Sequence, residues 1–119
     1  LEPGGTFLTQ QVGNDDAGEV EKWFGPRLGR PDTSLQRDAS MLQACGMKLD
    51  KTNEFRGRYL FPQVIDFIAY VQLVPWDVPS GFSVTKHYDK LLELHKTHCE
   101  KGEPLSLTCS RFMIVAHRP

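Results

Sequence analysis

The strongest constraint on the fold is a two-residue alternation between Met47 and Phe61. Polar or charged side chains fill the even positions from 48 to 58, whereas the apolar side chains stand at odd positions. These apolar residues are Met47, Leu49, Phe55, Tyr59 and Phe61. Because successive side chains of a strand point to opposite faces of a sheet, the pattern predicts a half-buried strand, with Gly57 as a position for a kink or bulge.

Two further strands are expected near the ends of the chain. The turn Pro3-Gly4-Gly5 leads into "TFLTQQV", which is rich in β-branched and aromatic residues, so Thr6 to Val12 is predicted to be a strand that ends at Gly13. Residues 104–117 form the last apolar segment, in which both odd and even positions become apolar toward the end. Such a segment is typical of a central strand covered on two faces.

Helical patterns fill the spaces between the strands. Start and stop signals place four helices at residues 14–24, 33–46, 62–74 and 83–102, with a loop at 27–32. Thr33 and Gln36 have the spacing of a capping box for the second helix, and Gly46 is placed to end it in a left-handed conformation. The order strand, helix, helix, strand, helix, helix, strand predicts a single α/β domain.

Composition argues against several kinds of partner. The formal net charge is -1, with acidic and basic residues mixed along the chain, so nothing indicates binding to nucleic acid. No stretch approaches the ~20 apolar residues of a membrane span, and we expect a cytoplasmic protein without a membrane partner. Three scattered cysteines, Cys45, Cys99 and Cys109, favour buried free thiols over disulfides. His95, His98 and Cys99 lie within one predicted helical turn, but no second ligand pair accompanies them, so no metal site is expected.

Several motifs in order resemble a known enzyme family. The opening "LEPGGTFLTQQVG" is similar to the turn and fifth strand of class I methyltransferases that use S-adenosylmethionine, and "LQACGMKLDKTNEFRGRYLF" is similar to the entry to their sixth strand. "YVQLVPWDVPSGFSVTKHYDKLLELHK" resembles a segment inserted before the last strand in an uncharacterised bacterial branch, and "SRFMIVAHRP" resembles the seventh strand. The resemblance covers nearly all 119 residues, but only the second half of the family's Rossmann-like domain.

The resemblance implies a specific fold. Residues 1–119 would be a single carboxyl-terminal portion of the domain, with an inserted acceptor-side helical segment at about residues 60–82. The sheet would be a three-stranded mixed sheet in the order first, last, middle, with the last strand antiparallel and about four helices around it. The first strand, Thr6–Val12, would then have an open edge rich in β-formers, through which we expect self-association or pairing with a partner.

The resemblance also implies a function. The chain would form the acceptor-binding part of an S-adenosylmethionine-dependent methyltransferase, acting on an unidentified acceptor that is a small molecule or of another kind. The family's glycine-rich cofactor loop follows its first strand, and no such loop occurs here, because Gly4-Gly5 precedes a strand. We therefore expect no cofactor-binding residue in this chain, no catalysis by the chain alone, and the amino-terminal half of the domain as its partner. The alternative is a stand-alone α/β ligand-binding or dimerisation module without catalytic activity.

Candidate acceptor-binding residues lie at the end of the first strand. In such sheets ligands bind beyond the carboxyl ends of parallel strands, which points to Gln10, Gln11 and Gly13. The two glutamines alternate in direction, and polar side chains at a strand end often only bind neighbouring loops, so one of the pair is expected to take part.

The inserted segment and the middle strand supply three more candidates. Tyr70 and Trp76 combine an apolar body with a polar group, which suits a ligand wall, although core packing is the alternative for this helix. Arg56, on the polar side of its strand, is a candidate for an acidic acceptor or is simply a solvated residue. No catalytic residue is assigned.

Overall fold

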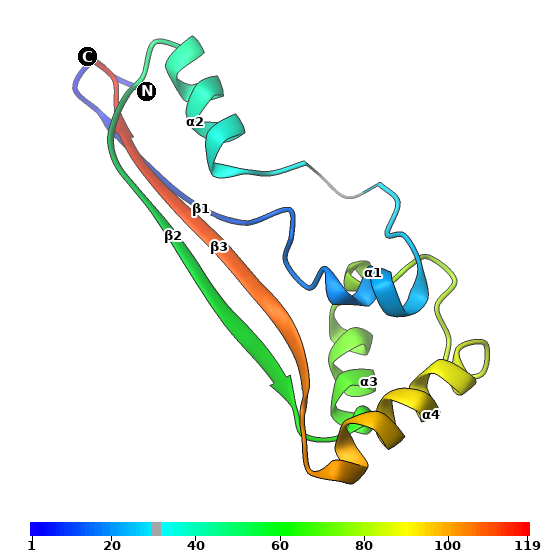
Figure 1. Cartoon of the computed structure of the whole chain (residues 1–119). Coiled ribbons are helices and arrows are strands. Elements are labelled where there is room, and N and C mark those ends of the chain that lie inside the picture. The colour runs from blue at the N-terminus through cyan, green and yellow to red at the C-terminus, as the bar shows by residue number, and fades with distance from the viewer. Residues whose placement is uncertain (30–31) are drawn as a thin grey trace. The chain divides into compact units, whose positions relative to one another are not determined.

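The computed structural model describes residues 1–29 and 32–119, and the loop expected at 27–32 therefore lies partly outside the described residues (Figure 1). The described chain divides into two compact units. One unit contains residues 1–16, 32–57 and 109–119, and the other contains residues 17–29 and 58–108. We refer to them as the turn-β1 unit and the helical unit.

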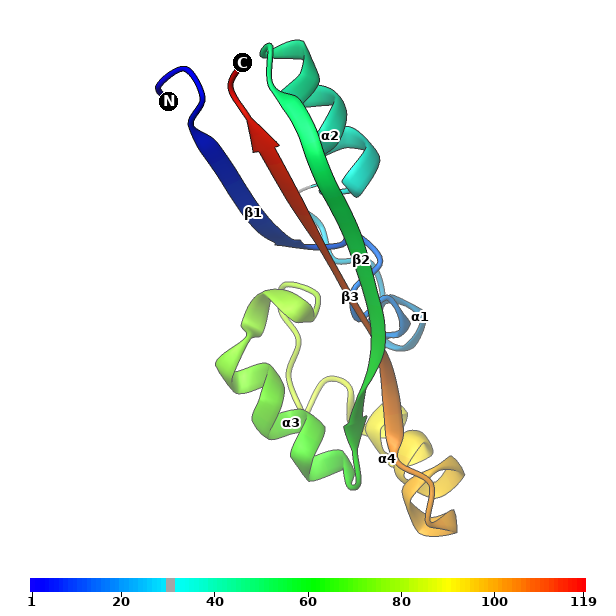
Figure 2. The ribbon, with the colours of Figure 1, turned by 90° about the vertical axis from the view of Figure 1, so that its left-hand side faces the viewer.

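Three strands form one sheet: β1 (Thr6–Val12), β2 (Lys48–Phe61) and β3 (Leu105–His117). Their order is β1-β3-β2, so the last strand lies between the other two (Figure 2). β1 pairs with β3 in the antiparallel direction, from Thr6 opposite His117 to Val12 opposite Arg111. β2 is also antiparallel to β3. The expected fold class is confirmed, including the order first, last, middle and the antiparallel last strand.

Antiparallel pairing of β2 with β3 is visible in two side-chain contacts. His117 Nδ1 lies 2.8 Å from a carboxylate oxygen of Asp50 near one end of the pair. Near the other end, Arg58 donates to the hydroxyl of Thr108 over 3.1 Å. The partner of a later β2 residue is an earlier β3 residue, as an antiparallel register requires.

Within residues 1–29 and 32–119 the chain forms four α-helices, in agreement with the sequence, but their bounds differ from those expected. They are α1 (Glu19–Phe24), α2 (Leu35–Ala44), α3 (Val64–Leu73) and α4 (Tyr88–Thr97), with 3₁₀ turns at Pro75–Asp77 and Cys99–Lys101. Each helix begins later than its start signal suggests, because polar residues ahead of it form turns of their own.

The starts of α2 and α3 illustrate this difference. Ser34, and not Thr33, caps α2: its hydroxyl accepts the backbone N–H of Arg37, whereas the Thr33 hydroxyl donates to the carbonyl of Val12. α3 is opened by a capping box of Gln63 and Asp66 that follows Pro62. Gly46 does adopt the left-handed conformation expected after the second helix, with φ of 86°.

An aromatic cluster forms the core of the helical unit. Phe67 is fully buried, and its ring stacks on Phe24 at a centroid distance of 5.9 Å. Trp23 and Phe61 meet Phe67 edge-on at 6.2 and 5.7 Å. Burial of each such side chain contributes about 1.5–3 kcal/mol relative to exposure, so truncating Phe67 to Ala is expected to cost about 3–5 kcal/mol.

The turn-β1 unit buries much less apolar surface. Its buried side chains include Phe112, Ile114 and Ala116, all on one face of β3. Other large apolar side chains stay exposed, among them Leu8 at 62% and Phe55 at 60%. The alternation in β2 is thus confirmed as a strand signal, but the apolar face at Phe55 is not buried.

Candidate functional site

A tight turn at the carboxyl end of β1 forms one wall of the candidate site. The Gly13 N–H donates to the carbonyl of Ser110, and the Asp16 N–H donates back to the carbonyl of Gly13. A Cβ at Gly13 would overlap the Ser110 hydroxyl oxygen and lie 3.1 Å from the Ser110 Cβ. Only glycine therefore fits this close approach of β1 and β3.

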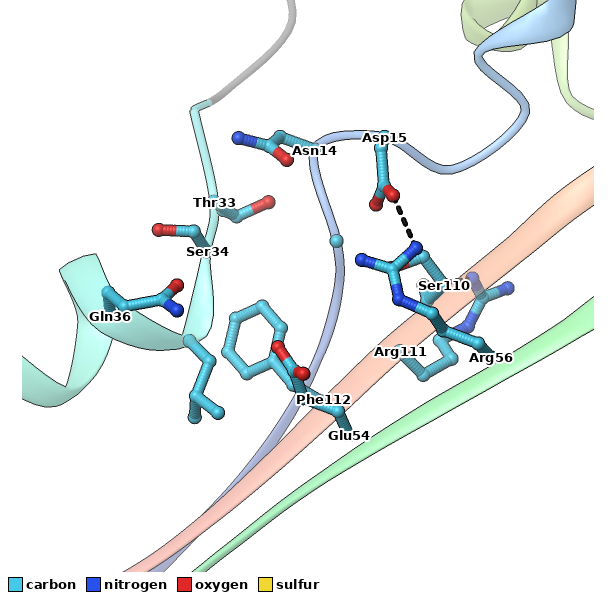
Figure 3. A pocket seen from close by; sticks show the side chains of 12 residues that line it. Asn14, Asp15, Thr33, Ser34, Gln36, Glu54, Arg56, Ser110, Arg111 and Phe112 are labelled. Atoms are coloured by element: carbon cyan, nitrogen blue, oxygen red, sulfur yellow. Dashed lines mark hydrogen bonds and ion pairs between the residues drawn. The ribbon is translucent and has the colours of Figure 1, made fainter.

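The turn borders a cavity of about 210 Å³ within the turn-β1 unit (Figure 3). Its lining comes from the end of β1, the start of α2 and the middle parts of β2 and β3. The lining residues are Gly13, Asn14, Asp15, Thr33, Ser34, Leu35, Gln36, Glu54, Arg56, Ser110, Arg111 and Phe112. Most of these side chains are polar or charged, so the cavity suits a small polar ligand.

Two of the lining residues, Asp15 and Arg56, form an ion pair. Arg56 Nη1 donates to Asp15 Oδ2 over 2.5 Å (Figure 3). The hydrogen bond from Arg56 lowers the pKa of Asp15 below its usual 3.8, and a hydrogen bond with Ser110 adds to this against the opposing effect of burial. The same bond raises the pKa of Arg56. Both side chains are partly exposed, at 45% for Asp15 and 61% for Arg56, so water screens the pair strongly.

A second ion pair, between Asp16 and Arg111, connects the turn to β3. Asp16 is buried, and its Oδ1 accepts both the backbone N–H of Ser110 over 2.7 Å and Arg111 Nη1 over 2.8 Å. The carboxylate charge is thus compensated by a guanidinium and an amide, as a buried carboxylate requires. This contact holds the turn against β3.

Glu54 brings a further charge to the cavity. Its exposed carboxylate has no hydrogen-bonding or ion-pair partner among the described residues. Glu54 stands two residues before Arg56, so both side chains lie on the same face of β2 (Figure 3). A free carboxylate and a guanidinium therefore border the cavity side by side.

The sequence-based candidates divide between cavity and non-cavity positions. Gly13 and Arg56 line the cavity. Gln10 and Gln11 do not line it; both are exposed on β1, and the Gln11 amide donates to the Thr9 hydroxyl over 2.8 Å. The binding roles of all four remain predictions, but only Gly13 and Arg56 stand beside a cavity.

Tyr70 and Trp76 belong to the helical unit and are not cavity residues. The Tyr70 hydroxyl donates to the buried carboxylate of Asp77 over 2.7 Å, which gives it a structural partner. Trp76 is 66% exposed. Their roles as a ligand wall remain predictions as well.

Asp15, Glu54 and Ser110 are cavity residues that the sequence analysis did not single out. Asp15 falls in the range 14–24 that the sequence predicts to be helical, but it lies in the turn before α1. Glu54 could have been found from its period-two relationship to Arg56, which places both on one face of a strand. Ser110 carried no signal, since its partner Gly13 lies 97 positions away in the sequence.

The described residues do not fit S-adenosylmethionine. The cavity of about 210 Å³ is smaller than the ~300–1,000 Å³ usual for cofactor-sized ligands, and no glycine-rich loop follows a strand in the part of the chain that the structure describes. No group of three or more His, Cys, Asp or Glu side chains within residues 1–29 and 32–119 is arranged to hold a metal ion. In the same ranges, no helix has the length and apolar character of a membrane span.

Comparison with known proteins gives matches among solved structures. No family model matches the chain, and no curated protein matches it. Among solved structures, the chain is similar to a protein from Bacillus halodurans C-125 described as "a putative methyltransferase", with a TM-score of 0.57 and 15% sequence identity. The similarity covers 100% of this chain and 53% of the other, so the chain spans about half the length of this structural relative. At this identity the match shows a methyltransferase-like fold.

Proposed function

We propose that the chain is the acceptor-binding, carboxyl-terminal portion of an S-adenosylmethionine-dependent methyltransferase. The observation that carries the proposal is the strand order β1-β3-β2 with β3 antiparallel to β1. Strands that follow one another in sequence are usually neighbours, so three strands would most simply form a β1-β2-β3 meander. The resemblance to class I methyltransferases instead requires the last strand in the centre.

The similarity to the protein from Bacillus halodurans supports the same proposal. It extends over all of this chain but only 53% of that one, as expected if the chain corresponds to one half of a methyltransferase domain. In this proposal the cofactor is held by polypeptide outside these 119 residues, because the described cavity is too small for it.

The acceptor site is proposed to be the cavity beside Gly13. It lies at the carboxyl end of β1, where ligands bind in open α/β sheets. Arg56, Glu54 and the polar side chains around them would bind and orient the acceptor. Orientation is the main contribution that a protein makes when the cofactor supplies the reactive group.

The proposal is tested with the full reading frame that contains this chain. We expect the purified protein to retain or bind S-adenosylmethionine, detected by mass spectrometry and calorimetry, and to transfer its methyl group to an acceptor. Arg56→Gln should reduce transfer while leaving cofactor affinity unchanged, and Lys51→Gln, an exposed β2 change outside the cavity, should affect neither. Absence of both cofactor binding and transfer would contradict the proposal.

The open edge of β1 favours the alternative, a ligand-binding or dimerisation module. β1 stands at the edge of the three-stranded sheet and presents Leu8, 62% exposed, together with the partly exposed Phe7 and Val12. Such an edge can pair with another strand. Under both the methyltransferase proposal and this alternative, the isolated chain is therefore expected to self-associate through β1.

A further inference from the structure

We propose that the cavity beside Gly13 selects small zwitterions, molecules that carry an ammonium and a carboxylate group, as its ligands. The inference rests on the proposed function for the identity of the site as an acceptor pocket. It goes further by naming the chemical class of acceptor and the residue that binds each end of it.

Glu54 is the proposed partner of the ammonium group. Its carboxylate borders the cavity and has no ion-pair partner among the residues that the structure describes. An ammonium group that binds Glu54 displaces no protein contact. The carboxylate of Asp15, by contrast, is already engaged by Arg56.

Arg56 is the proposed partner of the carboxylate group. A guanidinium has five N–H donors in a planar fork, and the ion pair with Asp15 engages Nη1. Arg56 is 61% exposed, so the remaining donors are accessible. A carboxylate can accept from them without breaking the contact to Asp15, which orients the guanidinium.

The presence of both a carboxylate and accessible guanidinium donors favours a zwitterion over a singly charged ligand. Asp15 and Arg56 form an ion pair, as do Asp16 and Arg111, whereas Glu54 forms no ion pair among the described side chains and acts on Arg56 only through its charge. An anion would bring its charge close to the Glu54 carboxylate, which the lining includes. A simple cation would leave the accessible donors of Arg56 unused.

Size sets the scale of the ligand. The cavity of about 210 Å³ is below the ~300–1,000 Å³ that drug-sized ligands occupy. The neutral groups around it, such as the Gln36 amide, add donors and acceptors without adding charge. A molecule of amino-acid size fits this description, and a nucleotide does not.

The test compares three forms of each ligand on the full reading frame. The probes are the α-amino acids, β-alanine and γ-aminobutyrate, each alongside its methyl ester, which is a cation, and its N-acetyl derivative, which is an anion. Binding is measured by saturation-transfer NMR and calorimetry. We expect at least one zwitterion to bind about tenfold or more tightly than both of its derivatives.

Two variants test which residue binds the ammonium group of the ligand and which binds its carboxylate. Glu54→Gln should weaken the zwitterion and the ester alike and should not weaken the N-acetyl form, whereas Arg56→Gln should weaken the zwitterion and the N-acetyl form and should not weaken the ester. Lys51→Gln is the control on the same strand. Arg56→Lys, which keeps the positive charge, controls for loss of the local fold and should bind with an affinity between those of the wild type and Arg56→Gln, because an ammonium lacks the planar fork of donors.

Three results would overturn the inference: an ester or an N-acetyl form that binds as well as its zwitterion, unchanged affinities in both charge-removing variants, or no binding by any zwitterion. Its failure is separable from that of the proposed function. Methyl transfer to an acceptor that is not a zwitterion would contradict the inference but support the proposed methyltransferase function. Zwitterion binding through Glu54 and Arg56 without any cofactor binding or transfer would support the recognition chemistry and reject the methyltransferase.

Discussion

The Ser110 side chain fills the space that any side chain at Gly13 would need. The two residues belong to neighbouring strands, and the Gly13 N–H donates to the Ser110 carbonyl over 3.0 Å. The cavity therefore depends on a glycine for the close approach of two backbones, and this dependence can be tested directly.

Gly13→Ala is expected to lower the free energy of unfolding by about 1–3 kcal/mol, because the new methyl group overlaps the Ser110 hydroxyl. Urea denaturation measures the change. Gly13→Ala combined with Ser110→Gly should recover most of the loss, since the second change removes the two Ser110 atoms that the methyl group meets and leaves only Asp15 Oδ1, at 3.2 Å. Additive effects in this double-mutant cycle would mean that the two residues are not in contact.

The Asp15–Arg56 ion pair predicts a pH dependence of stability. The folded-state pKa of Asp15 is lowered from 3.8, mainly by the hydrogen bond from Arg56. A carboxylate with a lowered pKa stabilises the fold above its unfolded pKa, and this contribution is lost as the pH falls through the folded value. Asp15→Asn should therefore lower the urea midpoint at neutral pH and have less effect once the pH falls below the lowered folded-state pKa of Asp15.

Asp89→Asn is the control for this measurement, because Asp89 is exposed and has no ion pair among the described residues. Its urea midpoint should follow that of the wild type over the whole pH range. A difference between Asp15→Asn and wild type that grows toward acid pH would contradict the assignment.

Glu19 is expected to contribute more to stability than an ordinary surface carboxylate. Burial opposes its ionised form, but the N–H and hydroxyl of Thr108 and the charge of Arg58 prevail, and its pKa is lowered from 4.5. Glu19→Gln should cost about 1–3 kcal/mol at neutral pH, since one of two half-buried carboxylate acceptors is replaced by an amide group that cannot accept. The stabilisation by Glu19 is present above about pH 4.5 and should disappear as the pH falls through the lowered value. Denaturation of the exposed variant Glu100→Gln provides the comparison.

Variants of Tyr70 and Trp76 are expected to differ in stability, because Tyr70 has a buried hydrogen-bond partner and Trp76 lies on the surface. Tyr70→Phe removes the hydroxyl that donates to the buried carboxylate of Asp77, so we expect a loss of about 1–3 kcal/mol in thermal or urea unfolding. Trp76→Ala, at a position 66% exposed, should change stability by less than about 0.5 kcal/mol. If Tyr70→Phe is neutral for stability but weakens acceptor binding, the ligand-wall role predicted from the sequence is supported instead.

Association through the edge of β1 should depend on Leu8. Sedimentation velocity of the isolated chain over a range of concentrations is expected to show dimers or larger species. Leu8→Lys places a charge on the exposed edge strand and should shift the distribution to monomer. Leu73→Lys, at an even more exposed position on α3, is the control and should leave association unchanged. A wild-type chain that stays monomeric at high concentration would contradict the edge-pairing proposal.

Much of the fold could be predicted from local sequence signals. β1 was expected at Thr6–Val12 and occupies those residues, because the turn ahead of it and Gly13 after it mark both ends. Strand order came from the family resemblance, since neither periodicity nor turn residues specify which strands pair. Helix starts were expected too early, because Asn, Asp, Ser and Thr residues stabilise turns as well as helix caps.

The burial pattern was harder to predict. In β3 the buried positions are odd at Leu105 and Leu107 but even from Ser110 to Ala116. Apolar residues at both odd and even positions predict a strand that is covered on two faces. A strand whose buried side chains change from odd to even positions part of the way along has the same composition.

The cavity could be predicted only in part, because its residues come from four segments far apart in the sequence. Gly13 and Arg56 were found from their places at a strand end and on a polar face. The contacts Gly13–Ser110 and Asp15–Arg56 join positions 97 and 41 apart and depend on strand pairing. Such contacts leave no periodic signature in the chain.

The free cysteines differ in accessibility: Cys45 is exposed, Cys99 is buried and Cys109 is intermediate. The sequence had suggested buried thiols at all three positions, and Cys45 departs from this because it caps the exposed end of α2. A thiol-reactive fluorophore should therefore modify Cys45 first and Cys99 only when its surroundings open. Counting the added labels over time by intact-mass spectrometry would then report on opening at Cys99 without any engineered reporter group.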